Sequence, residues 1–255
     1  MYLRPEVIST DWSDAVRFIE SHPLGLLTTA IPLSGQPTIQ ATHIPFLFDA
    51  PGTAPTTAVE NINNIATNST TGIWNGGDLG KLRCHLARSN PQAKALLSVP
   101  ELSLASEEIL VVFSDPNNAA GYVTPQWYIE TKPATAKTVP TWNYAELQLY
   151  GHARLTSPSQ IVRDLSDQEE KKYADKTQNG GKCWKVEDAP ANYIEIKERA
   201  IVGVEITITK AAFKLKMSRE NTNGDRKGVI DGLRQLGGHA EKEMADTVER
   251  LGPLK

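Results

Sequence analysis

Apolar and polar residues alternate along several stretches of this chain, which is the pattern of strands with one buried face. The clearest case is Val202, Val204, Ile206 and Ile208, which are separated by single residues. We expect two strands within 193–216 and a long strand pattern over 139–155. Shorter strands are predicted at 24–31, 38–48, 81–86 and 109–114. Many strands with few helices between them favour an antiparallel, closed or half-closed β-barrel with peripheral helices, a mostly β (α+β) fold.

Helical spacing of apolar residues predicts helices around this barrel. The first has Trp12, Ala15, Val16 and Ile19 at helical spacing, begins at Thr10 or Asp11 as its N-cap and is ended by His22-Pro23. A charged amphipathic helix is expected over 158–172. Two more helices, at about 225–236 and 239–251, are separated by a Gly-Gly pair. The chain therefore ends in a predicted helical pair.

Residues 51–80 form a stretch of unusual composition. They contain no Lys or Arg and are dominated by Thr, Asn, Pro, Gly and Ala. Such a composition buries too little apolar surface to offset the entropy lost on ordering, so we interpret the stretch as a surface insertion. The predicted organisation is one barrel domain over 1–216, carrying this insertion, and a helical tail over 217–255.

Charge and cysteine content narrow the class of protein. The 255 residues carry 27 Lys and Arg against 30 Asp and Glu, a net charge of −3, which gives no general attraction to nucleic acid or to anionic membranes. Cys84 and Cys183 lie far apart without a CxxC pair, which excludes a disulfide scaffold and a cysteine-rich zinc module. No run of 18 apolar residues occurs. We expect a cytoplasmic protein with no membrane partner.

The turn after the strand at 81–86 is a candidate anion site. Arg88 and Ser89 supply a guanidinium and a hydroxyl, and Asn90 precedes Pro91 as the predicted cap of a short helix. A phosphate needs these donors together with the free N–H groups of a helix N-terminus. The alternative is an ordinary helix cap with an exposed arginine, and the turn alone favours that interpretation.

Two strand histidines and two aromatic segments are further candidates. His43 and His85 lie in predicted strands and would form a ligand site only if both faced one cavity. The aromatic segments are 122–128 and 139–144, where Trp, Tyr, Thr, Asn and Pro are interleaved in a way that suits the wall of a flat ring system. Metal-ligand spacings, nucleophile triads and Gly-rich phosphate loops are missing from the sequence, so no metal site and no hydrolytic activity are predicted.

Four segments of the chain resemble the signature blocks of one protein family. They are Ala41-Thr42-His43-Ile44-Pro45, His85-Leu86-Ala87-Arg88-Ser89-Asn90-Pro91-Gln92, Tyr122-Val123-Thr124-Pro125-Gln126-Trp127-Tyr128 and Val139-Pro140-Thr141-Trp142-Asn143-Tyr144. These blocks are similar to those of PaiB-type proteins, FMN-binding split-barrel proteins described as negative regulators of protease synthesis and sporulation. The resemblance runs from Met1 to about Leu251.

The resemblance implies a six-stranded split barrel that forms a homodimer with FMN at the subunit interface. By position, Thr42 and His43 match residues that line the flavin pocket, and Arg88, Ser89 and Asn90 match the phosphate-binding turn. The remaining candidate cofactor-binding residues are His85, Lys132, Thr141, Trp142 and Asn143. No residue is marked as catalytic, so FMN-dependent oxidoreductase activity is left open.

Two other functions are alternatives to a flavoprotein. Some related split barrels handle haem, and His43, His85 or His239 could then be an axial ligand. A regulator that binds DNA directly would use the C-terminal helices, but 241–251 carry two bases against four acids, a net charge of −2. We therefore expect these helices to serve in packing or dimer contacts, and any regulatory effect to be indirect.

Overall fold

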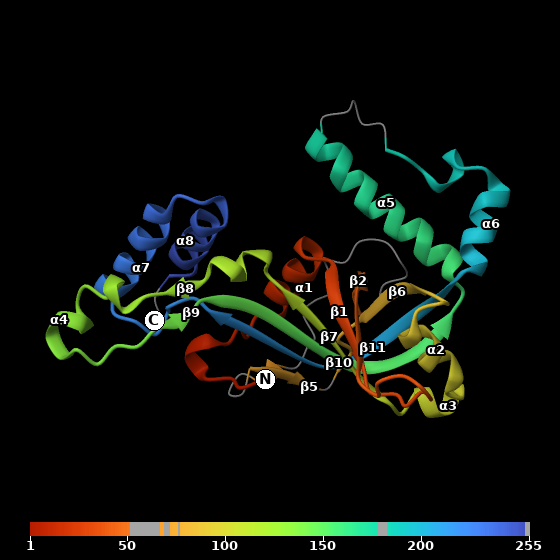
Figure 1. Cartoon of the computed structure of the whole chain (residues 1–255), viewed down its shortest axis with the longest axis horizontal. Helices are drawn as coiled ribbons and strands as arrows, with labels where there is room; N and C mark the ends of the chain where they lie inside the picture. The colour runs from red at the N-terminus through yellow and green to blue at the C-terminus, as the bar shows by residue number, and fades with distance from the viewer. Residues whose placement is uncertain (52–66, 69–71, 76, 178–182, 253–255) are drawn as a thin grey trace.

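The computed structural model describes residues 1–51, 67–68, 72–75, 77–177 and 183–252. Nine of its strands form one antiparallel sheet, in which β2, β1, β7, β10 and β11 are successive neighbours (Figure 1). The far edge of β11 pairs with β6 along its first half and with β5 along its second half. Strand β3 then pairs with the other edge of β6, and β4 pairs with β5. The bounds are β1 Leu24–Thr29, β2 Gln40–Pro45, β3 Leu47–Asp49, β4 Thr67–Asn68, β5 Ile73–Asn75, β6 Lys81–Ala87, β7 Glu108–Ser114, β10 Tyr144–Thr156 and β11 Ile201–Lys216.

The sheet is a curled half-barrel, which confirms the predicted split barrel with peripheral helices. Six of its strands, β1, β2, β6, β7, β10 and β11, have six or more residues, and β3, β4 and β5 have three or fewer. The long strands therefore match the six-stranded barrel that the family resemblance implies. Their inward residues form one continuous core, in which Phe46 and Phe113 pack edge to face with ring centres 5.6 Å apart.

Strand β11 changes phase in its middle. Val204 and Ile206 face the core in its first half, whereas Ala211 and Phe213 do so in its second half. The change occurs where the pairing with β10 shifts register between Tyr150 and Gly151, as an extra residue in β11 produces. The prediction of two strands within 193–216 is wrong, because 201–216 is one bulged strand and the residues before it form the exposed helix α6, Ala191–Arg199.

Helices surround the half-barrel. Helix α1, Trp12–Ser21, is capped by Asp11, whose side chain accepts from the Ser13 N–H at 2.8 Å, as the sequence predicts. Helix α5, Pro158–Thr177, and α6 project away from the sheet at one side (Figure 1), and no helix within the described ranges is long and apolar enough to cross a membrane. The 3₁₀ helix η5, Val186–Asp188, lies with α5 and α6 (Figure 1), and the others near the barrel are α2, Pro91–Ser98, α3, Glu101–Leu104, and the 3₁₀ helices η1, Pro5–Val7, and η3, Pro116–Ala120.

Part of the predicted surface insertion belongs to the sheet. Strand β5 pairs with β11, and Trp74 is 1% exposed, with its ring centre 5.3 Å from that of Trp12. The side chain of Trp74 is thus in the core, although most of the stretch around it is polar or glycine. The remainder of the predicted insertion, 52–66, 69–71 and 76, lies outside the described residues.

A second small sheet extends from the barrel and carries a segment that we call the arm, residues 122–142. It consists of β8, Tyr122–Val123, η4, Pro125–Trp127, α4, Thr131–Thr135, and β9, Thr141–Trp142, which pairs with β8. The predicted helical pair is present as α7, Asn223–Leu236, and α8, His239–Leu251. Helix α7 lies against the arm (Figure 1) and packs on η4.

Candidate functional site

The strand–turn–helix unit from β6 to α2 holds the candidate anion site. The Arg88 N–H donates to the Ala200 carbonyl at 2.8 Å, which fixes the end of β6, and Asn90 caps α2 by accepting from the Gln92 N–H at 2.9 Å. Between these two fixed points, Arg88 and Ser89 are exposed, and neither side chain has a hydrogen-bond or ion-pair partner within the described part of the chain. The turn therefore presents an unpaired cation and a free hydroxyl next to a helix N-terminus.

Two amides attach this turn to the β1–β2 hairpin. The Gln92 side chain is 1% exposed, and its Nε2 donates to the carbonyls of Leu27 and Gln40 and to Thr29 Oγ1, each at 3.1 Å. The Asn90 Nδ2 donates to Thr42 Oγ1 at 3.2 Å. The structure thus brings the predicted residues Thr42, Asn90, Arg88 and Ser89 together. Gln92 was not among the predicted site residues, because nothing local in the sequence indicates that it reaches β1 and β2.

The two strand histidines have different surroundings. His43 is exposed on β2, opposite Leu26 of β1. His85 is half-buried on β6, and its Nδ1 is buried without a hydrogen-bond partner. Burial lowers the pKa of His85, so its imidazole is neutral at pH 7. Because a buried polar atom normally has a hydrogen-bond partner, the Nδ1 of His85 is a candidate to bind a ligand or a water molecule.

The other four predicted residues lie on or beside the arm. Lys132, in α4, donates from Nζ to Gln126 Oε1, and Thr141 Oγ1 accepts from Lys216 Nζ, a group whose pKa burial lowers. Trp142 is 49% exposed and stands edge-on to Tyr122, with ring centres 5.5 Å apart. The arm therefore carries an exposed aromatic pair.

Asn143, by contrast, is an internal residue. It is 1% exposed; its N–H donates to the Gly121 carbonyl at 2.7 Å and its Oδ1 accepts from Ser218 Oγ at 3.0 Å. Its Nδ2 is buried without a partner. Asn143 thus joins β8, β9 and the residues after β11 at the base of the arm.

One chain does not bring all ten predicted residues together. The turn at the start of α2 lies at one end of the molecule, and the arm with α4 and β9 lies at the opposite end (Figure 1). The first group is Thr42, His43, His85, Arg88, Ser89 and Asn90, and the second is Lys132, Thr141, Trp142 and Asn143.

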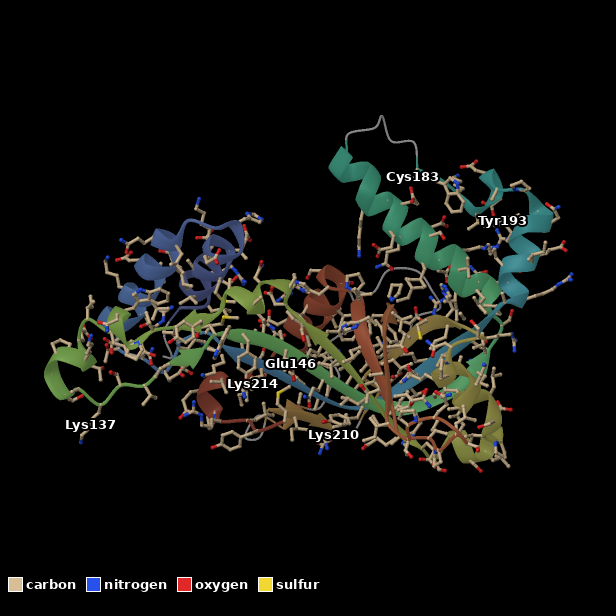
Figure 2. The ribbon with its side chains drawn as sticks, in the orientation of Figure 1. Lys137, Glu146, Cys183, Tyr193, Lys210 and Lys214 are labelled. Carbon is tan, nitrogen blue, oxygen red and sulfur yellow. The ribbon has the colours of Figure 1, made fainter. Side chains whose placement is uncertain are left out.

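A polar row on the outer face of β10 was missed by the sequence reasoning. Tyr150 OH donates to Gln148 Oε1 at 2.9 Å, and Gln148 Nε2 donates to Glu146 Oε1 at 2.7 Å. Burial, together with the charges of Glu108 and Glu146, raises the pKa of Tyr150. Glu146 and Lys214 occupy paired positions on β10 and β11 (Figure 2). The alternation of polar residues along 144–156 was the feature of the sequence from which this row could have been predicted.

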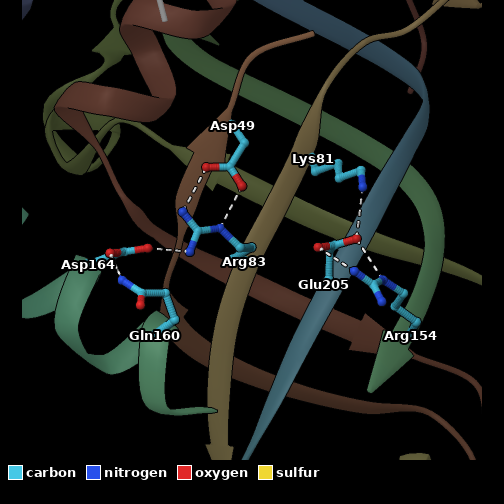
Figure 3. A network of polar contacts seen from close by, with 7 residues as sticks. All are labelled: Asp49, Lys81, Arg83, Arg154, Gln160, Asp164 and Glu205. Atoms are coloured by element: carbon cyan, nitrogen blue, oxygen red, sulfur yellow. Dashed lines mark hydrogen bonds and ion pairs between the residues drawn. The ribbon is translucent and has the colours of Figure 1, made fainter. Parts of the chain in front are cut away.

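A charged cluster lies on the outer face of β3, β6 and β11, beneath α5 (Figure 3). Arg83 donates to Asp49 and to Asp164 of α5, and Glu205 accepts from Lys81 and Arg154. Four members of the cluster, Asp49, Lys81, Arg83 and Glu205, line a cavity of about 490 Å³. Because each of these charges has a partner of opposite sign, we assign the cluster to fastening α5 and β11 rather than to binding. No three His, Cys, Asp or Glu side chains in the described ranges are placed to hold a metal ion.

Comparison with known proteins gives the family. A family model described as "Putative FMN-binding domain" matches residues 1–210. The chain belongs to this FMN-binding family. One relative is the uncharacterized protein AN0679 of Emericella nidulans. It is 39% identical to this chain over 277 residues, covering 100% of this chain and 99% of that protein.

A second relative carries a functional name. The protease synthase and sporulation protein PAI 2 of Bacillus subtilis is 28% identical over 200 residues, covering 78% of this chain and 85% of that protein. Together with the FMN-binding family match, this confirms the resemblance to PaiB-type proteins.

Solved structures similar to this chain were also found, at low sequence identity. The conserved hypothetical protein Rv2991 of Mycobacterium tuberculosis has a TM-score of 0.45 at 11% identity, covering 88% of this chain and 95% of that one. The flavocytochrome Anf3 of Azotobacter vinelandii has a TM-score of 0.42 at 14% identity, covering 81% of this chain and 68% of that one.

Proposed function

We propose that this chain is an FMN-binding flavoprotein in which Arg88 and Ser89 hold the cofactor phosphate. The observation that carries the proposal is the unpaired guanidinium and hydroxyl of the turn before α2, in a chain of the FMN-binding family. A phosphate dianion at this point would gain a charge-assisted contact with Arg88 and the favourable end of the α2 dipole. When bound, FMN would supply electron or hydride transfer at its ring system, which makes an oxidoreductase the enzyme class we propose.

We further propose that the flavin site is completed by a second copy of the chain. The arm and the turn lie at opposite ends of one chain, so Trp142 and Lys132 can meet Arg88 only across an interface. Leu26 and Val112 lie half-buried side by side on the outer face of β1 and β7, an apolar strip of the kind that a partner subunit covers.

A titration with FMN and riboflavin tests the phosphate contact. Arg88→Ala should weaken FMN binding by about 10- to 100-fold, the effect of losing a charge-assisted hydrogen bond of about 1.5–3 kcal/mol, and should leave riboflavin binding unchanged. Arg199→Ala removes an arginine that is 80% exposed on α6 and serves as the matched control. Wild-type protein that binds no FMN, or equal FMN affinity of the Arg88→Ala variant, would overturn the proposal.

Mixing two defective variants tests the shared site. If each flavin contacts Arg88 of one protomer and Trp142 of the other, Arg88→Ala and Trp142→Ala homodimers are both impaired. After subunit exchange, half of the dimers are mixed and each has one intact site, so about a quarter of all sites should bind FMN with wild-type affinity. No recovery on mixing would place the two residues in separate sites.

The same titrations address haem. A Soret band that appears on addition of haem and is lost in His85→Ala, without any FMN binding, would replace the flavin proposal with a haem protein. We propose that FMN is the ligand, because the unpaired groups at the turn suit a phosphate, whereas His43 is exposed on an outer strand.

Any regulatory role, which the resemblance to PaiB-type proteins implies, is proposed to be indirect. Residues 241–251 carry four acids against two bases, and although Arg234 of α7 pairs with Asp246 and Glu249 at 2.6 and 2.7 Å, the surface of α8 keeps a net negative charge. Such a surface is repelled by a DNA groove. A salt-dependent mobility shift of duplex DNA by the purified protein would refute this.

A further inference from the structure

The first N–H groups of α4 are capped by a residue that is remote in sequence. Glu130, which precedes the helix, provides no side-chain cap. Instead, Asp225 Oδ1 accepts from the Glu130 N–H at 2.8 Å and from the Thr131 N–H at 3.1 Å, and Oδ2 accepts from Thr131 at 3.3 Å. The N-terminus of this short helix thus depends on a carboxylate of the C-terminal helix α7.

Asp225 carries a buried charge at this junction. It is 3% exposed, and burial acts to raise its pKa, but hydrogen bonds from Thr131, Glu130 and Thr222 hold the pKa below its ordinary value. The group is therefore ionised at pH 7. It lies in the first turn of α7, where its own N–H donates to Thr222 Oγ1 at 3.2 Å, so one carboxylate faces the positive ends of two helices.

Helix α7 and the arm are in close contact next to this cap. A Cβ at Gly228 would overlap the Trp127 carbonyl oxygen, and a Cβ at Gly232 would overlap the Trp127 indole. Helix α7 is in turn held by α8, since Arg226 Nη2 donates to the Val248 carbonyl at 2.5 Å. The helical pair is thus a rigid support for the segment from Trp127 to Thr131.

Lys132 follows directly after this support. Its neighbour Thr131 donates its N–H to the carboxylate of Asp225. The direction of the first turn of α4 therefore determines where the ammonium group of Lys132 lies. We infer that Asp225 is a positioning residue for the flavin site, acting through α4 on Lys132. This inference rests on the proposed function, in which Lys132 reaches the flavin of the partner protomer.

The decisive measurement is the FMN affinity of full-length variants. Asp225→Asn keeps the shape and removes the charge, and should raise the Kd for FMN about tenfold, the effect of one charge-assisted hydrogen bond. Asp231→Asn is the matched control, because Asp231 lies on the same helix, is exposed and pairs with Lys227. Asp225→Glu, which retains the charge, should restore most of the affinity and also serves if Asp225→Asn does not fold.

A double mutant separates positioning from a general loss of stability. If Asp225 acts through Lys132, adding Asp225→Asn to Lys132→Ala should cause no further loss of FMN affinity. Full additivity of the two effects, or an unchanged Kd in Asp225→Asn, would overturn the inference.

Hydrogen exchange without FMN tests the cap independently of the proposed function. The amides of Glu130 and Thr131 should be protected in the wild type and in Asp231→Asn, and exchange faster in Asp225→Asn. Equal protection in all three proteins would refute the cap itself. Faster exchange in a protein that binds no FMN would leave the cap in place and refute the cofactor role together with the proposed function.

Discussion

Arg83 provides a test of how α5 is held to the barrel. Its side chain is 13% exposed; Nε and Nη2 donate to Asp49 at 2.5 and 2.8 Å, and Nη1 donates to Asp164 of α5 at 2.6 Å. The hydrogen bond to Asp49 is the main cause of the raised pKa of Arg83. Arg83→Met keeps the apolar stem and removes all three bonds, which leaves two carboxylates, 23% and 25% exposed, without a cation.

The expected cost follows from that burial. Breaking a fully buried pair costs about 3–5 kcal/mol, and because water reaches about a quarter of each carboxylate, we expect the Arg83→Met variant to lose about 2–3 kcal/mol of unfolding free energy at pH 7. Asp164→Asn removes only the link to α5, and should cost about 0.5–1.5 kcal/mol.

Urea unfolding followed by tryptophan fluorescence measures these differences. Arg199→Met, at a side chain that is 80% exposed, controls for the change in net charge and should cost less than about 0.5 kcal/mol. A loss in Arg83→Met no larger than in this control would refute the reasoning.

Two further predictions concern titratable groups. Hydrogen bonds from Arg154 are the main cause of a pKa of Glu205 below its ordinary value of 4.5. The extra unfolding free energy of the wild type over Glu205→Gln should therefore be constant from about pH 7 to 5 and be lost as pH falls through the folded-state pKa; growth of the difference in acid would contradict this. Burial raises the pKa of the fully buried Cys84 thiol, whereas Cys183 is partly exposed. A thiol reagent should modify only Cys183 in the native protein, as peptide masses will report, and native labelling of Cys84 would contradict its burial.

The fold could be predicted from the sequence where the signal is local. Strand alternation and the caps Asp11 and Asn90 are decided by neighbouring residues, and the structure has both caps. The phase change in β11 could not be predicted, since the extra residue is defined only by pairing with β10. The burial of Trp74 was also missed, because its place in the core comes from pairing with β11 and contact with Trp12.

The candidate site was predictable in part for the same reason. Arg88 and Ser89 were found from helix-cap chemistry, which acts over a few residues. The contact of Asp225 with the start of α4 could not be predicted, because its partners lie 94 and 95 residues away along the chain. Gln92 likewise reaches acceptors 52 to 65 residues away.

Within 85–92, some residues hold the turn in place and others have free side chains, and this difference matters when such segments are used to find relatives. The side-chain amides of Asn90 and Gln92 donate to Thr42 and to β1 and β2, and Pro91 starts α2, whereas the side chains of Arg88 and Ser89 have no partner within the described residues. A search pattern built on these eight residues would therefore select chains able to make the turn, whether or not they hold a ligand. Under the proposed function, the identities at positions 88 and 89, together with His85 and its unpartnered Nδ1, would separate chains that bind the cofactor from chains that have kept only the turn.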